Sequence, residues 1–398
     1  MTLLHGPAPR TSAEGGETSQ LQAFTETVFD CLPRVDQRRW AERYIEALLR
    51  TPGKKSVRRL ARSVSDSPTA AQAMHQFVNA SPWDWSAARQ GLLRWVRQTS
   101  PAVRAWTLAP AFIPKRGEHS AGVHRRYDPG LRRVSNCQLG MVVLATGDHG
   151  PLPVDWNLYI PHDWATDSAL RAKVRVPDEV CGPLWSQAAE VLQRVGSGFP
   201  GRQVPVTAEL SWLPDREAFL AHLVRSEQPF VVEVPDIVHV KHATSQSAGS
   251  PTRTVRQVLA DRAADGGERQ HVLSLAVALP GPARGRVRLR LLAQRSPSGS
   301  ARTWLTNLVD RPLPDLLPLM RQPRLATLAV DTLSGDFGLQ DFEGRSFPGW
   351  HHHTTLVSAA FTYSRVRASS VPSADGARAR PAGAVGAATG RSILRRPR

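Results

Sequence analysis

Cysteine is scarce in this chain of 398 residues, and the three that occur, Cys31, Cys137 and Cys181, lie far apart. Their number and spacing exclude a zinc knuckle and a disulfide framework, and they fit a reducing cytoplasm. No run of 18 uncharged apolar residues occurs, so we expect no membrane span. The first twenty residues also lack the basic start and apolar run of a secretory signal.

Lysine is nearly as scarce, with five residues among the 51 basic ones. A genome rich in G and C explains why arginine is used in place of lysine. It does not explain why 51 basic residues face only 34 acidic ones, a formal net charge of +17. This excess marks a basic protein and predicts a polyanionic partner, DNA first of all.

The organisation of the chain follows from its changes of composition. Residues 1–22 are poor in large apolar groups and predict a disordered N-terminus. Residues 23–100 show apolar side chains at helical spacing, which predicts a helical domain. Residues 101–364 alternate short apolar runs with helical patterns, which predicts an α/β core with a β-rich insertion at about 235–310. The arginine-rich residues 365–398 predict a disordered basic tail.

Five basic residues stand close together between two predicted helices of the first region. They are Lys54, Lys55, Arg58, Arg59 and Arg62. Such a cluster can bind DNA phosphates, but it is equally typical of a solvated helix face. The sequence leaves both readings open.

A series of short motifs, in a fixed order, covers residues 24–364. The most informative is the segment 148–161, which reads DHGPLPVDWNLYIP. Together the motifs resemble bacterial insertion-sequence transposases of the DDE superfamily, specifically the insertion-sequence 701 group. The other motifs that carry the resemblance are Arg38-Arg39, Ala80–Asp84, Pro114–Gly117, His119–Val123, Asn136–Gln138, Val176–Val180, Glu343–Ser346 and Gly349–Leu356.

The resemblance implies a ribonuclease-H-like core, interrupted by the β-rich insertion and preceded by a helical DNA-binding region. It also implies metal-dependent cutting and joining of DNA. Two divalent cations, Mg²⁺ or Mn²⁺, hold the attacking and leaving oxygens in that chemistry, and hard carboxylate oxygens hold the cations. Two of the three acids lie at strand ends and the third on a later helix. By analogy with these relatives, the protein is expected to act as a homodimer and to associate with the nucleoid in the cytoplasm of a bacterium.

The three acidic positions depart from the family pattern. The stretch that reads Asp-Asp-Thr-Gly in relatives is here Ala109–Phe112, which has no metal ligand. The second position is Glu209, one methylene longer than the usual Asp. The third falls near Thr327 or Leu328, and Asp331, one helical turn further on, is a possible substitute. The sequence therefore predicts no complete metal site, and Mg²⁺ or Mn²⁺ only if the protein is active.

The main hypothesis is a transposase relative that folds and binds DNA but is catalytically impaired or inactive, a pseudoenzyme. A first alternative is an active transposase whose site is rearranged and uses Asp128, Asp155 or Asp331. The sequence does not decide whether the protein is an enzyme.

A second alternative is a fold recruited for another role, as a regulator, an interaction module or a small-molecule enzyme. Its cleft would be lined by Ala109, Phe112 and Thr327. Nothing in the sequence names a ligand for it.

For several other residues the sequence allows two interpretations of their role. The run His351–His353 resembles a metal cluster, but adjacent residues of a helix point in different directions, which favours packing. Cys137 stands in an apolar strand with no base nearby, which favours a buried structural thiol. Lys115 and Arg116 follow the first lost acid and could hold a DNA phosphate, as could Arg345, or they could be solvated.

Overall fold

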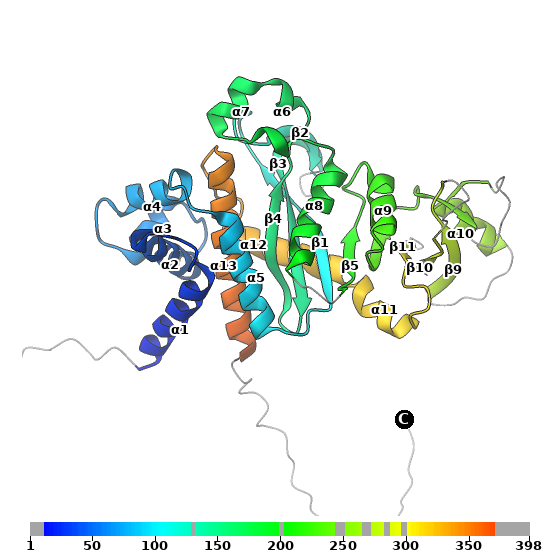
Figure 1. Cartoon of the computed structure of the whole chain (residues 1–398), viewed down its shortest axis with the longest axis horizontal. Helices are drawn as coiled ribbons and strands as arrows, with labels where there is room; N and C mark the ends of the chain where they lie inside the picture. Colours follow the sequence, from blue (N-terminus) through cyan, green and yellow to red (C-terminus); the bar gives the residue numbers. More distant parts are fainter. Residues whose placement is uncertain are drawn as a thin grey trace, which may run out of the picture.

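The structure, a computed structural model, describes residues 12–128, 132–198, 203–242, 251–264, 272–281, 287–295 and 301–370. Its first part is helical, and its second part is built on one large mixed sheet (Figure 1). The helices of the first part are α1 (Ser12–Val28), α2 (Val35–Arg50), α3 (Val57–Val64), α4 (Ala70–Asn79) and α5 (Trp85–Thr99).

Each of these helices buries one apolar face. In α2 the residues Ala41, Tyr44, Ile45 and Leu48 recur at helical spacing and are buried, as expected of an amphipathic helix. Helix α5 begins at a capping residue, Asp84, whose carboxylate accepts two backbone N–H groups of the first turn. The buried side chains belong to the same hydrophobic core as the sheet.

The central part of the sheet has the strand order β4-β3-β1-β5-β6. Strands β1, β3 and β4 form an antiparallel meander, and β5 and β6 run parallel to β1. Helix α8 connects β4 to β5 and helix α9 connects β5 to β6. This connectivity is that of a ribonuclease-H-like core. The bounds are β1 (Ala105–Pro114), β3 (Arg133–Gly147), β4 (Gly150–Leu158), α8 (Leu184–Ser197), β5 (Val206–Glu209), α9 (Arg216–Arg225) and β6 (Phe230–Val234).

Two segments that project from the antiparallel meander lie together at the top of Figure 1. One carries β2 (His124–Asp128), which pairs with the start of β3. The other follows β4 and contains α6 (Asp163–Thr166), α7 (Ser168–Val174) and a short 3₁₀ helix, Asp178–Val180.

The predicted β-rich insertion follows β6 and continues the same sheet. Strand β11 pairs antiparallel with β6, and β10, β9 and β7 follow in that order. The insertion also contains one helix. Its elements are β7 (His239–His242), β8 (Arg253–Thr254), α10 (Val255–Ala264), β9 (Val272–Ala278), β10 (Leu289–Arg295) and β11 (Ala301–Thr306).

Three helices complete the chain: α11 (Leu313–Met320), α12 (Gln322–Gly335) and α13 (Phe347–Ser370). Helix α12 packs across β1, β4 and β5. Helix α13 lies between the first helices and the sheet, packing against α2, α4, α5 and β4. It is buried on all sides over most of its length, as expected of a helix that is enclosed by other elements.

The predicted disorder at both ends is wrong for some residues. Helix α1 begins at Ser12, and α13 continues to Ser370, so residues 12–22 and 365–370 are helical. The rest of the two predicted segments, residues 1–11 and 371–398, lies outside the described residues. The functional division of the chain at about residue 100 stays a prediction. Among the described residues no helix is both long enough and apolar enough to cross a membrane.

Candidate functional site

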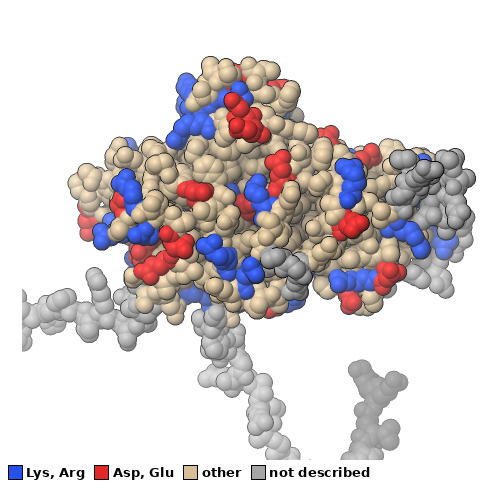
Figure 2. All heavy atoms as spheres, in the orientation of Figure 1, with Lys and Arg blue, Asp and Glu red and all other residues tan. Residues whose placement is uncertain are grey.

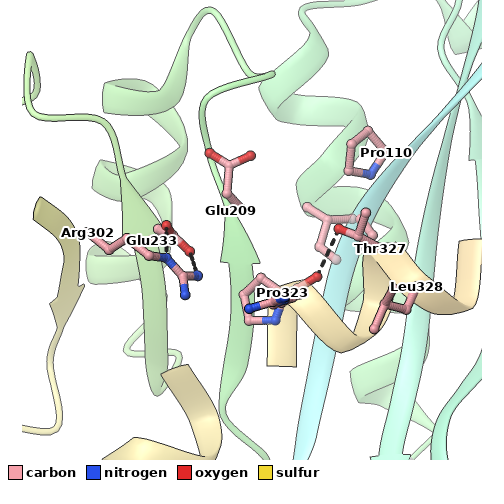
Figure 3. Close-up of a pocket in the computed structure, with 10 residues that line it drawn as sticks. Pro110, Glu209, Glu233, Arg302, Pro323, Thr327 and Leu328 are labelled. Carbon is pink, nitrogen blue, oxygen red and sulfur yellow. Dashed lines mark hydrogen bonds and ion pairs between the residues drawn. The ribbon is translucent and has the colours of Figure 1, made fainter. Parts of the chain in front are cut away.

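The fold brings the three expected acidic positions into one cleft of about 340 Å³. Ala109 lies in β1, Glu209 ends the neighbouring parallel strand β5, and Thr327 faces them from α12. Carboxyl ends of parallel strands meet at one edge of a sheet, which explains why residues so distant in sequence converge. Figure 3 shows this cleft. Its lining residues are Leu108, Ala109, Pro110, Glu209, Glu233, Arg302, Pro323, Arg324, Thr327 and Leu328.

Glu209 is the one acid that remains at the three positions. Its Oε1 accepts the backbone N–H of Ser211 at 2.6 Å, and its Oε2 accepts the Ser211 hydroxyl at 2.9 Å. Burial raises the pKa of Glu209, and the negative charge of Glu233 raises it further, against the lowering effect of the two Ser211 bonds. Both oxygens of the Glu209 carboxylate therefore accept hydrogen bonds from Ser211, two residues further along the chain.

The sequence reading missed a second carboxylate in the cleft. Glu233 in β6 is the register partner of Glu209 and binds Arg302 of β11 through two hydrogen bonds of 2.8 and 2.5 Å. The guanidinium lies over the Trp304 ring, 4.9 Å from its centroid. A single acid in the otherwise apolar segment Phe230–Val234 was the available signal.

These residues do not fit a pair of divalent cations. Ala109 offers no ligand, and the Thr327 hydroxyl donates to the Pro323 carbonyl oxygen at 3.1 Å. The oxygens of Glu209 and Glu233 are engaged by Ser211 and Arg302. Over the part of the chain that the structure describes, no group of three His, Cys, Asp or Glu side chains could hold a metal ion.

The proposed substitute acids lie elsewhere. Asp155 in β4 is buried between Arg89 and Arg194, at 3.1 and 3.0 Å. Asp331 is exposed on α12, and it is not among the residues that line the cleft. The side chain of Asp128 lies outside the described residues. Phe112, expected in the lining, instead lies beneath the Arg126 guanidinium.

Two of the lysines predicted to bind phosphate make contacts within the protein. Lys55 is only 4% exposed, and its ammonium donates to the carbonyls of Leu48 and Thr51 at the end of α2. Burial lowers its pKa. Lys115 is partly buried and donates to the Phe342 carbonyl at 2.9 Å, and burial lowers its pKa to about 8. Sequence spacing cannot distinguish a lysine that caps a neighbouring carbonyl from one that faces solvent.

The other predicted DNA contacts are exposed: Lys54, Arg58, Arg59, Arg62, Arg116 and Arg345. Arg58 lies where a groove of about 720 Å³, beside the segment 341–344, meets one of about 550 Å³ that Arg62 also lines. Lys54 pairs with Glu343 at 3.5 Å. On the face drawn in Figure 2, basic side chains are interspersed with acidic ones. The α3 arginines therefore offer accessible cations, without a continuous basic patch on that face.

The three adjacent histidines of α13 are buried and point to different neighbours, so the packing interpretation is confirmed. The His351 Nδ1 lies 3.0 Å from the Arg89 guanidinium. His352 lies between two backbone carbonyls at 2.8 and 2.9 Å and stacks on the Trp83 ring. His353 lies between the Tyr44 hydroxyl and the Gly338 carbonyl. Burial lowers the pKa of His352 and of His353 to about 4, so neutral His352 donates to one carbonyl at a time. Cys137 is fully buried in β3.

A comparison with protein families bears on this cleft. A family described as DDE superfamily endonuclease matches residues 27–286. No curated protein sequence matches the chain. Among solved structures, a cryo-EM structure of the piggyBac transposase synaptic complex with hairpin DNA is similar with a TM-score of 0.44 and 12% sequence identity. The match covers 88% of this chain and 73% of that one. The family match extends over more than half of the chain, and the protein therefore belongs to the DDE superfamily endonucleases.

Proposed function

We propose that the protein is a transposase-family DNA-binding protein, related to the bacterial insertion-sequence 701 group, whose metal-dependent strand cleavage is lost or strongly impaired. The observation that carries this proposal is the cleft itself. The three positions where the DDE pattern needs acids meet there, and only Glu209 is a carboxylate.

The size of the impairment follows from the chemistry. A bound metal contributes several kcal/mol of transition-state stabilisation to phosphodiester cleavage. Each 1.4 kcal/mol changes a rate by a factor of about ten, so losing the metal pair costs at least roughly a thousandfold. Lengthening the remaining acid from Asp to Glu shifts its carboxylate by about 1 Å, which such a site tolerates poorly.

DNA binding does not need the lost acids. Phosphate contacts depend on exposed cations and on the release of counterions. The formal charge of +17 and the exposed arginines Arg58 and Arg62 support DNA binding. We propose a homodimer on DNA by analogy with transposases, and a location on the bacterial nucleoid. Sedimentation of the protein with and without DNA measures the oligomeric state.

The decisive experiment combines binding and cleavage on the full chain. Purified protein is incubated with Mg²⁺ or Mn²⁺ and DNA that carries the terminal repeats flanking its gene. We expect binding whose affinity falls steeply with salt, and no nicking. Affinity that is flat between low and moderate salt contradicts the DNA-binding part of the proposal.

An active enzyme with a rearranged site is the second candidate, because Glu233 places another carboxylate beside Glu209. Metal-dependent nicking that disappears in Glu209→Ala, but persists in Asp331→Ala, would establish it. Asp331→Ala is the matched control because that acid is exposed on α12 outside the cleft lining.

A further inference from the structure

The cleft that contains the three expected acidic positions also contains a permanent positive charge, the Arg302 guanidinium. We propose that the Arg302 guanidinium acts as a built-in cation: it neutralises the carboxylate of Glu233, partly offsets the charge of Glu209 and keeps divalent metal out of the cleft. This inference rests on the proposed function, because it concerns a cleft in which two of the three expected acids are absent.

The two carboxylates are held close together by the sheet. Glu209 and Glu233 are register partners on parallel strands β5 and β6, and neighbouring strands lie about 4.8 Å apart. Register partners point to the same face, so both side chains enter the cleft. Each charge affects the other, since Glu233 raises the pKa of Glu209. Two such carboxylates require a nearby cation or a proton.

Arg302 is positioned to supply that cation. Its Nε and Nη2 donate to the two oxygens of Glu233, a bidentate geometry that fixes the guanidinium. The Trp304 ring lies against it. The hydrogen bond and charge of Glu233, and then the charge of Glu209, raise the pKa of Arg302. Arginine also stays protonated at every physiological pH, so this cation cannot be lost by titration.

The arrangement is unfavourable for metal. A divalent ion at Glu233 would compete with both guanidinium hydrogen bonds for the carboxylate and would lie beside a fixed positive charge. Ala109 and Thr327 provide no carboxylate to compensate. Figure 3 shows Glu209 between the Glu233–Arg302 pair on one side and Pro110 and Thr327 on the other. Removing Arg302 would leave two adjacent carboxylates on one face, and a hard divalent cation prefers such oxygens.

The test measures Mn²⁺ binding to the full chain by titration calorimetry and by electron paramagnetic resonance of the free ion. We expect that any Mn²⁺ bound by wild type is also bound by Glu209→Gln, so that no binding depends on Glu209. Arg302→Met should gain one ion, with a dissociation constant on the order of 1 mM. That ion should be lost again when Glu233→Gln is added.

Two control variants accompany it. Arg324→Met removes another arginine of the same cleft lining and should not create the site. Arg302→Lys keeps a positive charge and should also remain without metal. Circular dichroism confirms that each variant is folded.

Either of two results overturns the proposal. One is Mn²⁺ binding by wild type that Glu209→Gln abolishes, a measurement that does not depend on whether any Arg302 variant folds. The other is a folded Arg302→Met that gains no ion. DNA affinity is measured on the same samples. If wild type does not bind DNA, the proposed function is contradicted. The Mn²⁺ measurements test only the role of Arg302.

Discussion

Arg89 on α5 and Asp155 on β4 form a buried ion pair, with Nη1 of the arginine 3.1 Å from Oδ1 of the aspartate. The other oxygen of Asp155 accepts a hydrogen bond from Arg194 on α8. The guanidinium of Arg89 also donates to Thr354 and Thr355 of α13. One arginine thus joins the helical first part of the chain to the sheet and to the last helix.

Asp155→Ala is expected to lower the free energy of unfolding by about 3–5 kcal/mol, because it leaves a buried guanidinium without its carboxylate. Urea denaturation measures the change. Asp148→Ala is the control: its partner Arg104 is more than half exposed, and such surface pairs contribute about 1 kcal/mol or less. Equal effects of the two substitutions would show that the buried pair does not join these elements.

His353 should make stability depend on pH. Its pKa is lowered by burial from 6.5 to about 4, so the unfolded chain binds the proton more readily. The stability that the neutral ring provides is full above pH 6.5 and is lost progressively as pH falls towards 4. Between pH 7 and pH 5 this one residue accounts for about 2 kcal/mol.

The measurement compares wild type with His353→Gln by urea denaturation at the two pH values. Glutamine keeps a polar side chain facing Tyr44 and Gly338 but cannot titrate. The variant should lose about 2 kcal/mol less than wild type on acidification. The same loss in both proteins would assign the pH dependence to other groups, such as His351 and His352.

The arginines of α3 should contribute to DNA affinity through charge alone. Arg58→Ala with Arg62→Ala is expected to weaken binding to all sequences alike and to reduce the slope of log affinity against log salt by about 2. Fluorescence anisotropy over a salt series measures the slope. Arg256→Ala removes an exposed arginine that already pairs with Asp236, and it should leave the slope nearly unchanged. An unchanged slope in the double variant would place the DNA elsewhere.

Much of the fold could be predicted from local patterns. Among the apolar runs that predicted strands in the α/β core, 137–145 and 230–234 lie in β3 and β6, and 152–158 lies in β4. The helical pattern at 325–333 lies within α12. The family motif could also place Ala109, Glu209 and Thr327 at one site. These features depend on the spacing of apolar residues along the chain or on short, contiguous sequence motifs.

The roles that escaped prediction depend on tertiary contacts. Arg302 reaches Glu233 across 69 positions of sequence, and no local pattern marks the pair. Lys55 belongs to a run of basic residues but turns inward to cap α2. A charged residue has the same sequence signature whether it meets solvent, DNA or a buried carbonyl, because only the fold decides its neighbours.

Restoring the acids should restore the chemistry if the cleft is an ancestral active site. Ala109→Asp, Glu209→Asp and Thr327→Asp return carboxylates to the three positions, and Arg302→Met removes the competing cation. We expect the fourfold variant to bind Mn²⁺ and to nick DNA at least roughly a thousandfold faster than wild type, since metal activation supplies several kcal/mol. Relaxation of supercoiled plasmid measures the rate.

The matched control for this variant moves only the third acid. Leu325→Asp in place of Thr327→Asp puts a carboxylate on the same helix, at a residue that does not line the cleft. A metal pair needs all its ligands within one site, so this control should bind Mn²⁺ more weakly and should not nick. Equal nicking by both variants would mean that the third ligand comes from elsewhere, and that Thr327 does not mark the ancestral acidic position.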